Sequence, residues 1–102
     1  MDRPINCLIV DDNKVARMLL QQILIKIDGI NILGEFDDPL KAKTYIENNN
    51  IDILFLDIEM PGGNGLELAR EIDPVMTKVI FTTAYRNYSI HAIKVNAFDY
   101  LL

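Results

Sequence analysis

The sequence contains little of what secreted, membrane-spanning or nucleic-acid-binding proteins need. It has a single cysteine, Cys7, which excludes an internal disulfide and fits a reducing compartment. No apolar run approaches the length that spans a bilayer, and residues 1–4 do not open a signal peptide. Basic residues are in deficit, with 10 Lys and Arg against 15 Asp and Glu, for a formal net charge of -5. These absences predict a cytoplasmic domain that binds neither membrane nor nucleic acid directly.

What is present is a regular alternation of strand-like and helix-like segments within 102 residues, half of them hydrophobic. Apolar strands are expected at residues 5–10, 31–35, 53–56, 78–83 and 97–102. Helices are expected after each of the first four, the last of them at about 88–94. Such alternation predicts one α/β domain with a parallel sheet and right-handed crossovers. The second strand has few apolar residues, which favours an edge position.

The helix boundaries have recognisable signals. An apolar stripe marks the first helix, formed by Val15, Leu19, Ile23 and Ile27. Gly29 is expected to close that helix. Asp38-Pro39 predicts the start of the second helix, because an N-cap residue is followed by proline at the first helical position. The Asn48–Asn50 triplet is expected to end that helix. Asn64 is expected to cap the third helix.

Asp57 stands at the end of the most apolar strand. The run Ile53–Leu56 is typical of a strand buried on both faces, and it stops at this carboxylate. A proline and three glycines follow within eight residues, which predicts a tight loop. Open α/β sheets carry their chemistry at the carboxyl ends of strands, so Asp57 is the leading candidate for a functional residue.

Other polar residues end neighbouring strands. Asp11 and Asp12 follow the first strand, and Thr83 ends the fourth. If the first strand lies between the second and third, these groups meet at one edge of the sheet. Three carboxylates brought together repel one another, and a hard divalent cation such as Mg²⁺ is their natural partner. This grouping indicates phosphoryl transfer onto a carboxylate nucleophile, with the Thr83 hydroxyl as a hydrogen-bond donor.

Each of these residues also has a plainer interpretation. Asp11 and Asp12 precede a helix and could cap it. Asp57 could be a turn residue, and Thr83 could be an ordinary β-branched strand residue. Tyr100 could simply pack in the core. The interpretation as a site gains weight because all the carboxylates end buried strands on the same side.

Four motifs in order carry a resemblance to a known family: Leu8–Asp12, Leu56–Gly65, Phe81–Ala84 and Asp99–Leu102. Together they resemble the receiver domain of two-component response regulators, over residues 1–102. The resemblance implies a flavodoxin-like three-layer sandwich with strand order 2-1-3-4-5. It implies a signalling domain rather than an enzyme, with self-phosphorylation and self-dephosphorylation at most.

The resemblance also assigns roles. Asp57 would accept a phosphoryl group from a sensor histidine kinase, and with Thr83 it would carry the chemistry. The remaining implied roles are Mg²⁺ ligands at Asp11, Asp12, Asp57 and the main-chain carbonyl of Glu59, a switch hydroxyl at Thr83 and a switch aromatic at Tyr100. The residues of Thr83–Tyr85 and Val95–Tyr100 are similar to the matching segments of regulators that carry a LytTR-type DNA-binding domain. The resemblance therefore implies that the output is regulation of transcription.

The chain departs from the family pattern at its end. Where Leu102 stands last, the family continues with a lysine, a proline and a fifth helix. The lysine would pair with the phosphoryl oxygens, so its absence weighs against switching by this chain. Because the lysine, the proline and the helix are all absent, we expect a C-terminally truncated receiver. The missing helix would expose apolar surface, with Cys7, Ile9, Phe98 and Leu101 as candidates, and we expect self-association to a dimer.

Two other function classes remain open. A metal-dependent aspartyl-phosphate phosphatase of the haloacid-dehalogenase type also uses an aspartate nucleophile. It needs that residue in an Asp-x-Asp pair after the first strand, whereas here the first-strand pair is adjacent. The third class is a receiver-like scaffold that binds partners without phosphorylation. The acidic pair and Asp57 argue against it, and the absent lysine argues for it.

Overall fold

The computed structural model of the 102-residue chain describes residues 3–60, 63–82 and 99–101. Its elements, in chain order, are β1 Ile5–Val10, α1 Lys14–Leu24, β2 Ile30–Phe36, α2 Pro39–Glu47, β3 Ile53–Leu56, β4 Glu59–Met60, β5 Gly63–Asn64, α3 Gly65–Glu71, β6 Lys78–Thr82 and β7 Asp99–Leu101. The expected helix at 88–94 lies outside the described residues. Within them, no helix is long and apolar enough to cross a membrane.

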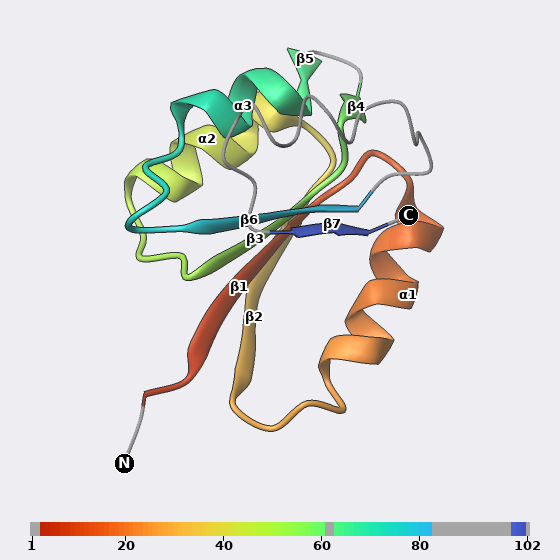
Figure 1. Ribbon diagram of the computed structural model, residues 1–102. Coiled ribbons are helices and arrows are strands. Elements are labelled where there is room, and N and C mark those ends of the chain that lie inside the picture. The colour runs from red at the N-terminus through yellow and green to blue at the C-terminus, as the bar shows by residue number, and fades with distance from the viewer. Residues whose placement is uncertain (1–2, 61–62, 83–98, 102) are drawn as a thin grey trace.

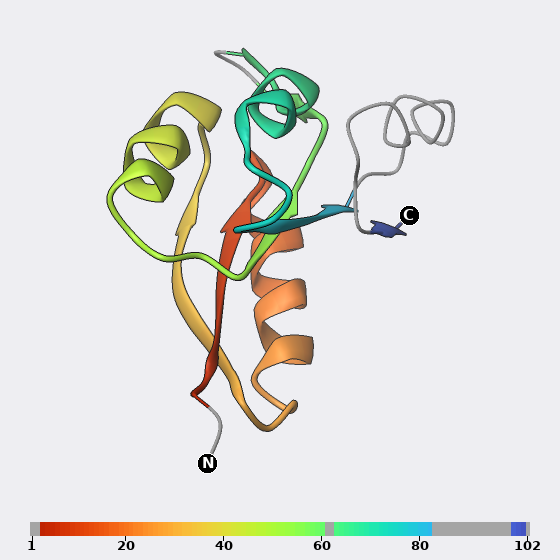
Figure 2. The same ribbon diagram turned by 60° about the vertical axis from the view of Figure 1, so that its left-hand side comes forward.

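Five of the strands form one parallel sheet in the order β2-β1-β3-β6-β7. This is the predicted flavodoxin-like order, with the weakly apolar β2 at one edge. Helices α2 and α3 cover one face of the sheet and α1 covers the other, as the two views show (Figures 1 and 2). The remaining strands, β4 and β5, pair as a small antiparallel ribbon directly before α3.

The central strands are apolar on both faces because both faces are covered. Alternate residues of β1 enter different clusters: Leu8 and Val10 pack with α2 and α3, whereas Cys7 and Ile9 pack beneath α1. All four are at most 1% exposed. Cys7 is therefore a small buried core residue. Its burial raises the pKa of the thiol to about 11.

Two expectations about α1 are wrong. The helix ends at Leu24 rather than running to Gly29, because the next amides bond three residues back: Lys26 N–H donates to Ile23 O and Ile27 N–H to Leu24 O. Gly29 instead occupies the turn into β2, with a φ of 88° that suits glycine.

The predicted apolar stripe of α1 is also not its buried face. Val15, Leu19 and Ile23 are 64%, 57% and 59% exposed, while Leu20 and Leu24 pack on the sheet. The helix has two apolar faces and only one contacts the strands. Exposed apolar side chains therefore lie on α1. Cys7 and Ile9 are buried, and the side chains of Phe98 and Leu101 lie outside the described part of the chain.

The predicted signals of α2 are confirmed. The Asp38 carboxylate accepts from Leu40 N–H at 2.7 Å, and Pro39 takes the first helical position. Ala42 is fully buried. The helix ends before Asn48, whose side-chain amide donates to Thr44 O at 2.8 Å. Helix α3 begins directly after Asn64, whose side chain is not among those described.

Asp52 joins the strands at the amino-terminal edge of the sheet. Its carboxylate accepts two hydrogen bonds from the Arg3 guanidinium and one from Asn6 N–H, each 2.7 Å long. Its main-chain carbonyl accepts from Lys78 N–H at 2.9 Å. The Arg3 and Asn6 hydrogen bonds hold the pKa of the Asp52 carboxyl at about 2, below its ordinary value.

We expect Asp52→Asn to lower the free energy of unfolding by about 1 kcal/mol at neutral pH. Because the folded-state pKa is depressed, this contribution is present above the unfolded-state value of about 4 and is lost as pH falls toward 2. The difference between wild type and variant should therefore shrink over that window. Urea denaturation at several pH values measures it, and a difference that is independent of pH would contradict the assignment.

Candidate functional site

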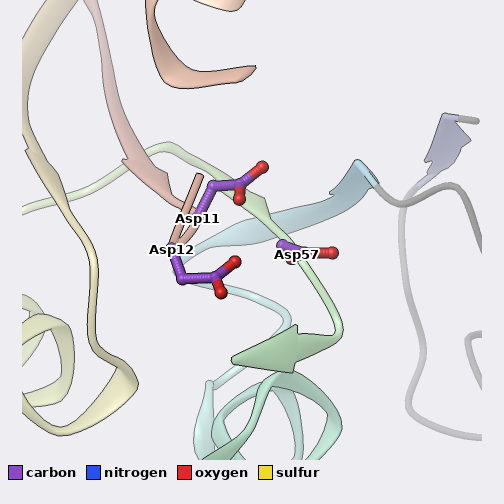
Figure 3. Close-up of side chains that lie close together, drawn as sticks. All are labelled: Asp11, Asp12 and Asp57. Atoms are coloured by element: carbon purple, nitrogen blue, oxygen red, sulfur yellow. The ribbon is translucent and has the colours of Figure 1, made fainter. Parts of the chain in front are cut away.

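The site forms where two adjacent parallel strands end. Val10 of β1 pairs with Leu56 of β3, so the residues that follow these strands leave the sheet side by side. The loop after β3 is tied to the end of β1, because Asp57 N–H donates to Val10 O at 2.8 Å. Figure 3 shows the outcome: the carboxylates of Asp11, Asp12 and Asp57 lie together at this edge.

The cluster brings together three of the residues that the sequence singled out. One oxygen from each of Asp11, Asp12 and Asp57 lies within 4.8 Å of the other two. Asp11 is buried, Asp57 is half-buried and Asp12 is exposed. The cluster is thus open to solvent on the side of Asp12.

Asp11 is restrained through both its side chain and its backbone. Its carboxylate accepts from Asn13 N–H at 2.9 Å, and its own N–H donates to Phe36 O at 3.0 Å. Burial raises the pKa of the Asp11 carboxyl above its ordinary value, and the nearby Asp12 carboxylate raises it further, against the opposing hydrogen bond from Asn13. The charged cluster is therefore electrostatically costly without a cation.

Helix capping does not account for the acidic pair. The N-cap of α1 is Asn13, whose side-chain oxygen accepts from Ala16 N–H at 3.0 Å. Asp11 supports that cap by accepting the Asn13 amide, and Asp12 is not the capping residue. The plainer interpretation of Asp12 as a cap is therefore wrong.

The donor set fits a hard divalent cation. Three carboxylates that differ in exposure offer only oxygen ligands, which Mg²⁺ prefers. Mg²⁺ keeps several waters when one or two carboxylates bind it, and the exposed side of the cluster leaves room for them. Asp11, Asp12 and Asp57 could hold the ion together.

Gly65, at the start of α3, is packed against the backbone that carries Asp57. A Cβ added at Gly65 would lie 2.9 Å from Ile58 Cα and still closer to the Asp57 carbonyl oxygen. The neighbours are main-chain atoms, which cannot rotate away. The hydrogen bond from Gly65 N–H to Ile58 O completes this close approach. Glycine at this position thus fixes how tightly the loop after β3 folds back on α3.

The other predicted site residues are placed only in part. Glu59 opens β4 and pairs with Asn64, so its backbone is described and its side chain is not. Tyr100 lies in β7, paired with Phe81 of β6, and its side chain is likewise not described. Thr83 lies outside the described residues. The roles of all three stay predictions.

The structure also reveals a contact that the sequence analysis missed. Arg17 of α1 donates from Nη1 to the Asp11 carbonyl at 2.6 Å and from Nε to Glu35 of β2 at 2.7 Å. Gln21, one turn later, donates to the other carboxylate oxygen of Glu35. A possible signal was the spacing: Arg17 and Gln21 share one helix face shortly after an acidic pair.

Comparison with known proteins identifies the relatives of this chain. The family model described as "Response regulator receiver domain" matches residues 7–102. The transcriptional regulatory protein BtsR of Salmonella typhi is 41% identical over 99 residues, which are 96% of this chain and 41% of that protein. The chain spans about two-fifths of the length of the curated relatives it matches.

Solved structures agree. The response regulatory domain of protein mrkE from Klebsiella pneumoniae superposes with a TM-score of 0.89 at 31% identity, over 95% of this chain and 81% of that one. A CheX-CheY-BeF3-Mg²⁺ complex from Borrelia burgdorferi gives a TM-score of 0.86 at 30% identity, over 98% of this chain and 78% of that one.

Neighbouring single substitutions separate capping from the acidic cluster. In EDTA, Asn13→Ala should lower the free energy of unfolding by about 1 kcal/mol, because it removes the cap of α1. Asp12→Ala should leave it unchanged or raise it, because it removes a negative charge beside Asp11. Urea midpoints of both variants measure this. An equal loss in the two would mean that Asp12 shares the capping.

Proposed function

Because this chain belongs to the response regulator receiver domain family, we propose that Asp57 accepts a phosphoryl group from a histidine kinase. The observation that carries the proposal is the convergence of Asp57 with Asp11 and Asp12 at the carboxyl edge of the sheet. An isolated turn aspartate would need no acidic neighbours, and repulsion would disfavour them. Binding of a cation and a phosphoryl group would account for why the three carboxylates lie together.

In the proposed reaction, a carboxylate oxygen of Asp57 attacks the phosphorus of the donor. A bond forms between that oxygen and phosphorus, the bond from phosphorus to the donor breaks, and the donor leaves with the electron pair. The chain's own contribution is position. Asp57 N–H is held by Val10 O, and Gly65 packs against the Asp57 carbonyl, so the nucleophile stands on a fixed backbone.

We further propose Mg²⁺ as the cofactor, held by Asp11, Asp12, Asp57 and the main-chain carbonyl of Glu59. When bound, it would offset the negative charge of the carboxylates and of the phosphoryl oxygens. The donor set of this chain supports the choice, and one of the similar solved structures is a CheX-CheY complex with BeF3 and Mg²⁺. Thr83 would donate its hydroxyl to a phosphoryl oxygen, and Tyr100 would change position as the switch.

The parent protein is proposed to be a cytoplasmic transcription regulator. BtsR is described as a transcriptional regulatory protein, and this chain aligns with about two-fifths of it. A DNA-binding output domain of the LytTR type, separate from this receiver, would then respond to the state of Asp57. The acidic balance of the receiver supports leaving nucleic-acid contact to that domain.

The alternatives are weaker. Membership of the receiver family weighs against a haloacid-dehalogenase-type phosphatase, because receiver domains are signalling domains. A scaffold that works without phosphorylation would not need Asp11, Asp12 and Asp57 within ligand distance of one another. The phosphorylation test below decides between scaffold and phosphoacceptor.

Asp57 should be the phosphorylated residue. Incubation of the chain with acetyl phosphate and Mg²⁺ should give a hydroxylamine-labile mass increase that maps to Asp57 and disappears in EDTA. Asp57→Asn should abolish it, because the amide is not a nucleophile. Intact-mass and peptide spectrometry measure both.

Asp52→Asn is the matched control, because Asp52 precedes β3 at the amino-terminal edge of the sheet, opposite the edge that carries the acidic cluster. It should phosphorylate like wild type. A labile modification that survives in Asp57→Asn would reject the assignment, and complete absence of modification in wild type would favour the scaffold.

Self-association is proposed through the exposed apolar face of α1, formed by Val15, Met18, Leu19 and Ile23. We expect the chain to be a dimer at tens of micromolar by light scattering after size exclusion. Leu19→Glu should shift it to monomer, because it places a charge in that face. Leu40→Glu is the control, since Leu40 is similarly exposed but lies on α2, across the sheet. A wild-type monomer would contradict the proposal.

A further inference from the structure

Arg17 places its guanidinium beside the acidic cluster, where it makes hydrogen bonds to Asp11 and Glu35. Its side chain is only 13% exposed. It reaches two elements at once, the carbonyl of Asp11 after β1 and the carboxylate of Glu35 on β2. A guanidinium cannot lose its charge in a protein, so burial requires such partners.

The partner of Arg17 is itself held in place. Glu35 presents one oxygen to Arg17 at 2.7 Å and the other to the side-chain amide of Gln21. Arg17 and Gln21 lie on successive turns of α1 and on the same face of the helix, so both reach Glu35 from one side. The carboxylate is thereby fixed from two sides, and it fixes the plane of the guanidinium. This three-residue contact ties α1 to the edge strand.

The consequence reaches the acidic pair through one peptide group. The Asp11 N–H is held by Phe36 O at 3.0 Å and its carbonyl by Arg17 at 2.6 Å. Because the peptide unit is planar, fixing that carbonyl also fixes the N–H and Cα of Asp12. Asp12 is exposed, so packing does not set its direction. The peptide that Arg17 holds thus sets the position of the Cα from which the Asp12 side chain extends.

The charge of Arg17 works the other way. A cation beside a cluster that binds cations repels the incoming ion, so charge alone would make Arg17 unfavourable for metal binding. We propose that Arg17 is a positioning residue, which orients the Asp11–Asp12 peptide so that both carboxylates face the metal site. The inference rests on the proposed Mg²⁺ site and adds a residue that acts on it without touching the ion.

Geometry and charge predict opposite signs in one experiment. Mg²⁺ affinity of the whole chain is measured by calorimetric titration without any phosphoryl donor. Arg17→Met should weaken Mg²⁺ binding about tenfold, as loss of a partner that orients a metal ligand commonly does. If Arg17 acted by charge alone, the same substitution would tighten binding. Arg17→Lys keeps the charge but lacks the planar fork, so it should also weaken binding.

Arg3→Met is the matched control. It removes the same charge and also a guanidinium–carboxylate pair, but at the amino-terminal edge, where Arg3 contacts Asp52. Its Mg²⁺ affinity should stay within about twofold of wild type. Circular dichroism and urea midpoints confirm that each variant is folded at the titration temperature. Arg17→Lys retains the buried cation and serves as the test should Arg17→Met fail to fold.

The outcomes are distinct. Unchanged or tighter Mg²⁺ binding in folded Arg17 variants overturns the positioning role and leaves the proposed function intact. Equal weakening in Arg3→Met also overturns it, because the effect would not then depend on the contact with Asp11. Absence of Mg²⁺ binding in wild type overturns the proposed metal site itself, and the positioning role with it.

Discussion

The parallel pairing of β1 with β3 is the constraint on which the site depends. Val10 and Leu56 are partners in register, so the chain leaves both strands at the same height and on the same edge. Asp11 and Asp57 are 46 positions apart in the sequence and become neighbours only through that pairing. The apolar side chains of β1 and β3, buried on both faces, hold the register. The core packing that holds the register of β1 and β3 thus also determines the positions of Asp11 and Asp57.

Gathering negative charge at this edge has to be balanced by rigid support. The Asp11 carboxylate accepts the Asn13 amide, and its carbonyl accepts from Arg17. On the other strand, Gly65 allows α3 to approach the Asp57 backbone more closely than any residue with a Cβ could. All of these contacts involve main-chain atoms at or next to the acidic residues. They leave the cluster's carboxylates set in place while the exposed side of Asp12 stays open to water and ligands.

The two faces of the sheet are covered unequally in the described part of the chain. Helices α2 and α3 lie over one face, and α1 lies over the other. One side of α1 packs on the strands through Leu20 and Leu24, and another side presents Val15, Leu19 and Ile23 to solvent. An exposed apolar stripe of this kind is a surface for further packing. The site and this stripe are on different elements, linked through the Arg17 contact at the start of the same helix.

The sequence alone determined the elements and the chemistry that ends them. Alternating apolar segments predicted the parallel sheet, and the resemblance to the receiver family predicted its strand order. The Asp38-Pro39 start of α2 was correct, and the aspartates at strand ends predicted the acidic cluster. These succeed because period, capping and turn chemistry are local properties of the chain. The assignment of Asp57 as phosphoacceptor came from motifs and stays a proposal.

Only the tertiary structure decided which of several local possibilities is used. Helix α1 has two apolar faces, and contact with the sheet selects the one with Leu24. Asn13, and not Asp12, caps that helix, and the Asp11 carboxylate accepts the Asn13 N–H. The link from Arg17 to Asp11 and Glu35 joins residues up to 18 positions apart. Such choices depend on distances between segments, which no periodicity within a single segment encodes.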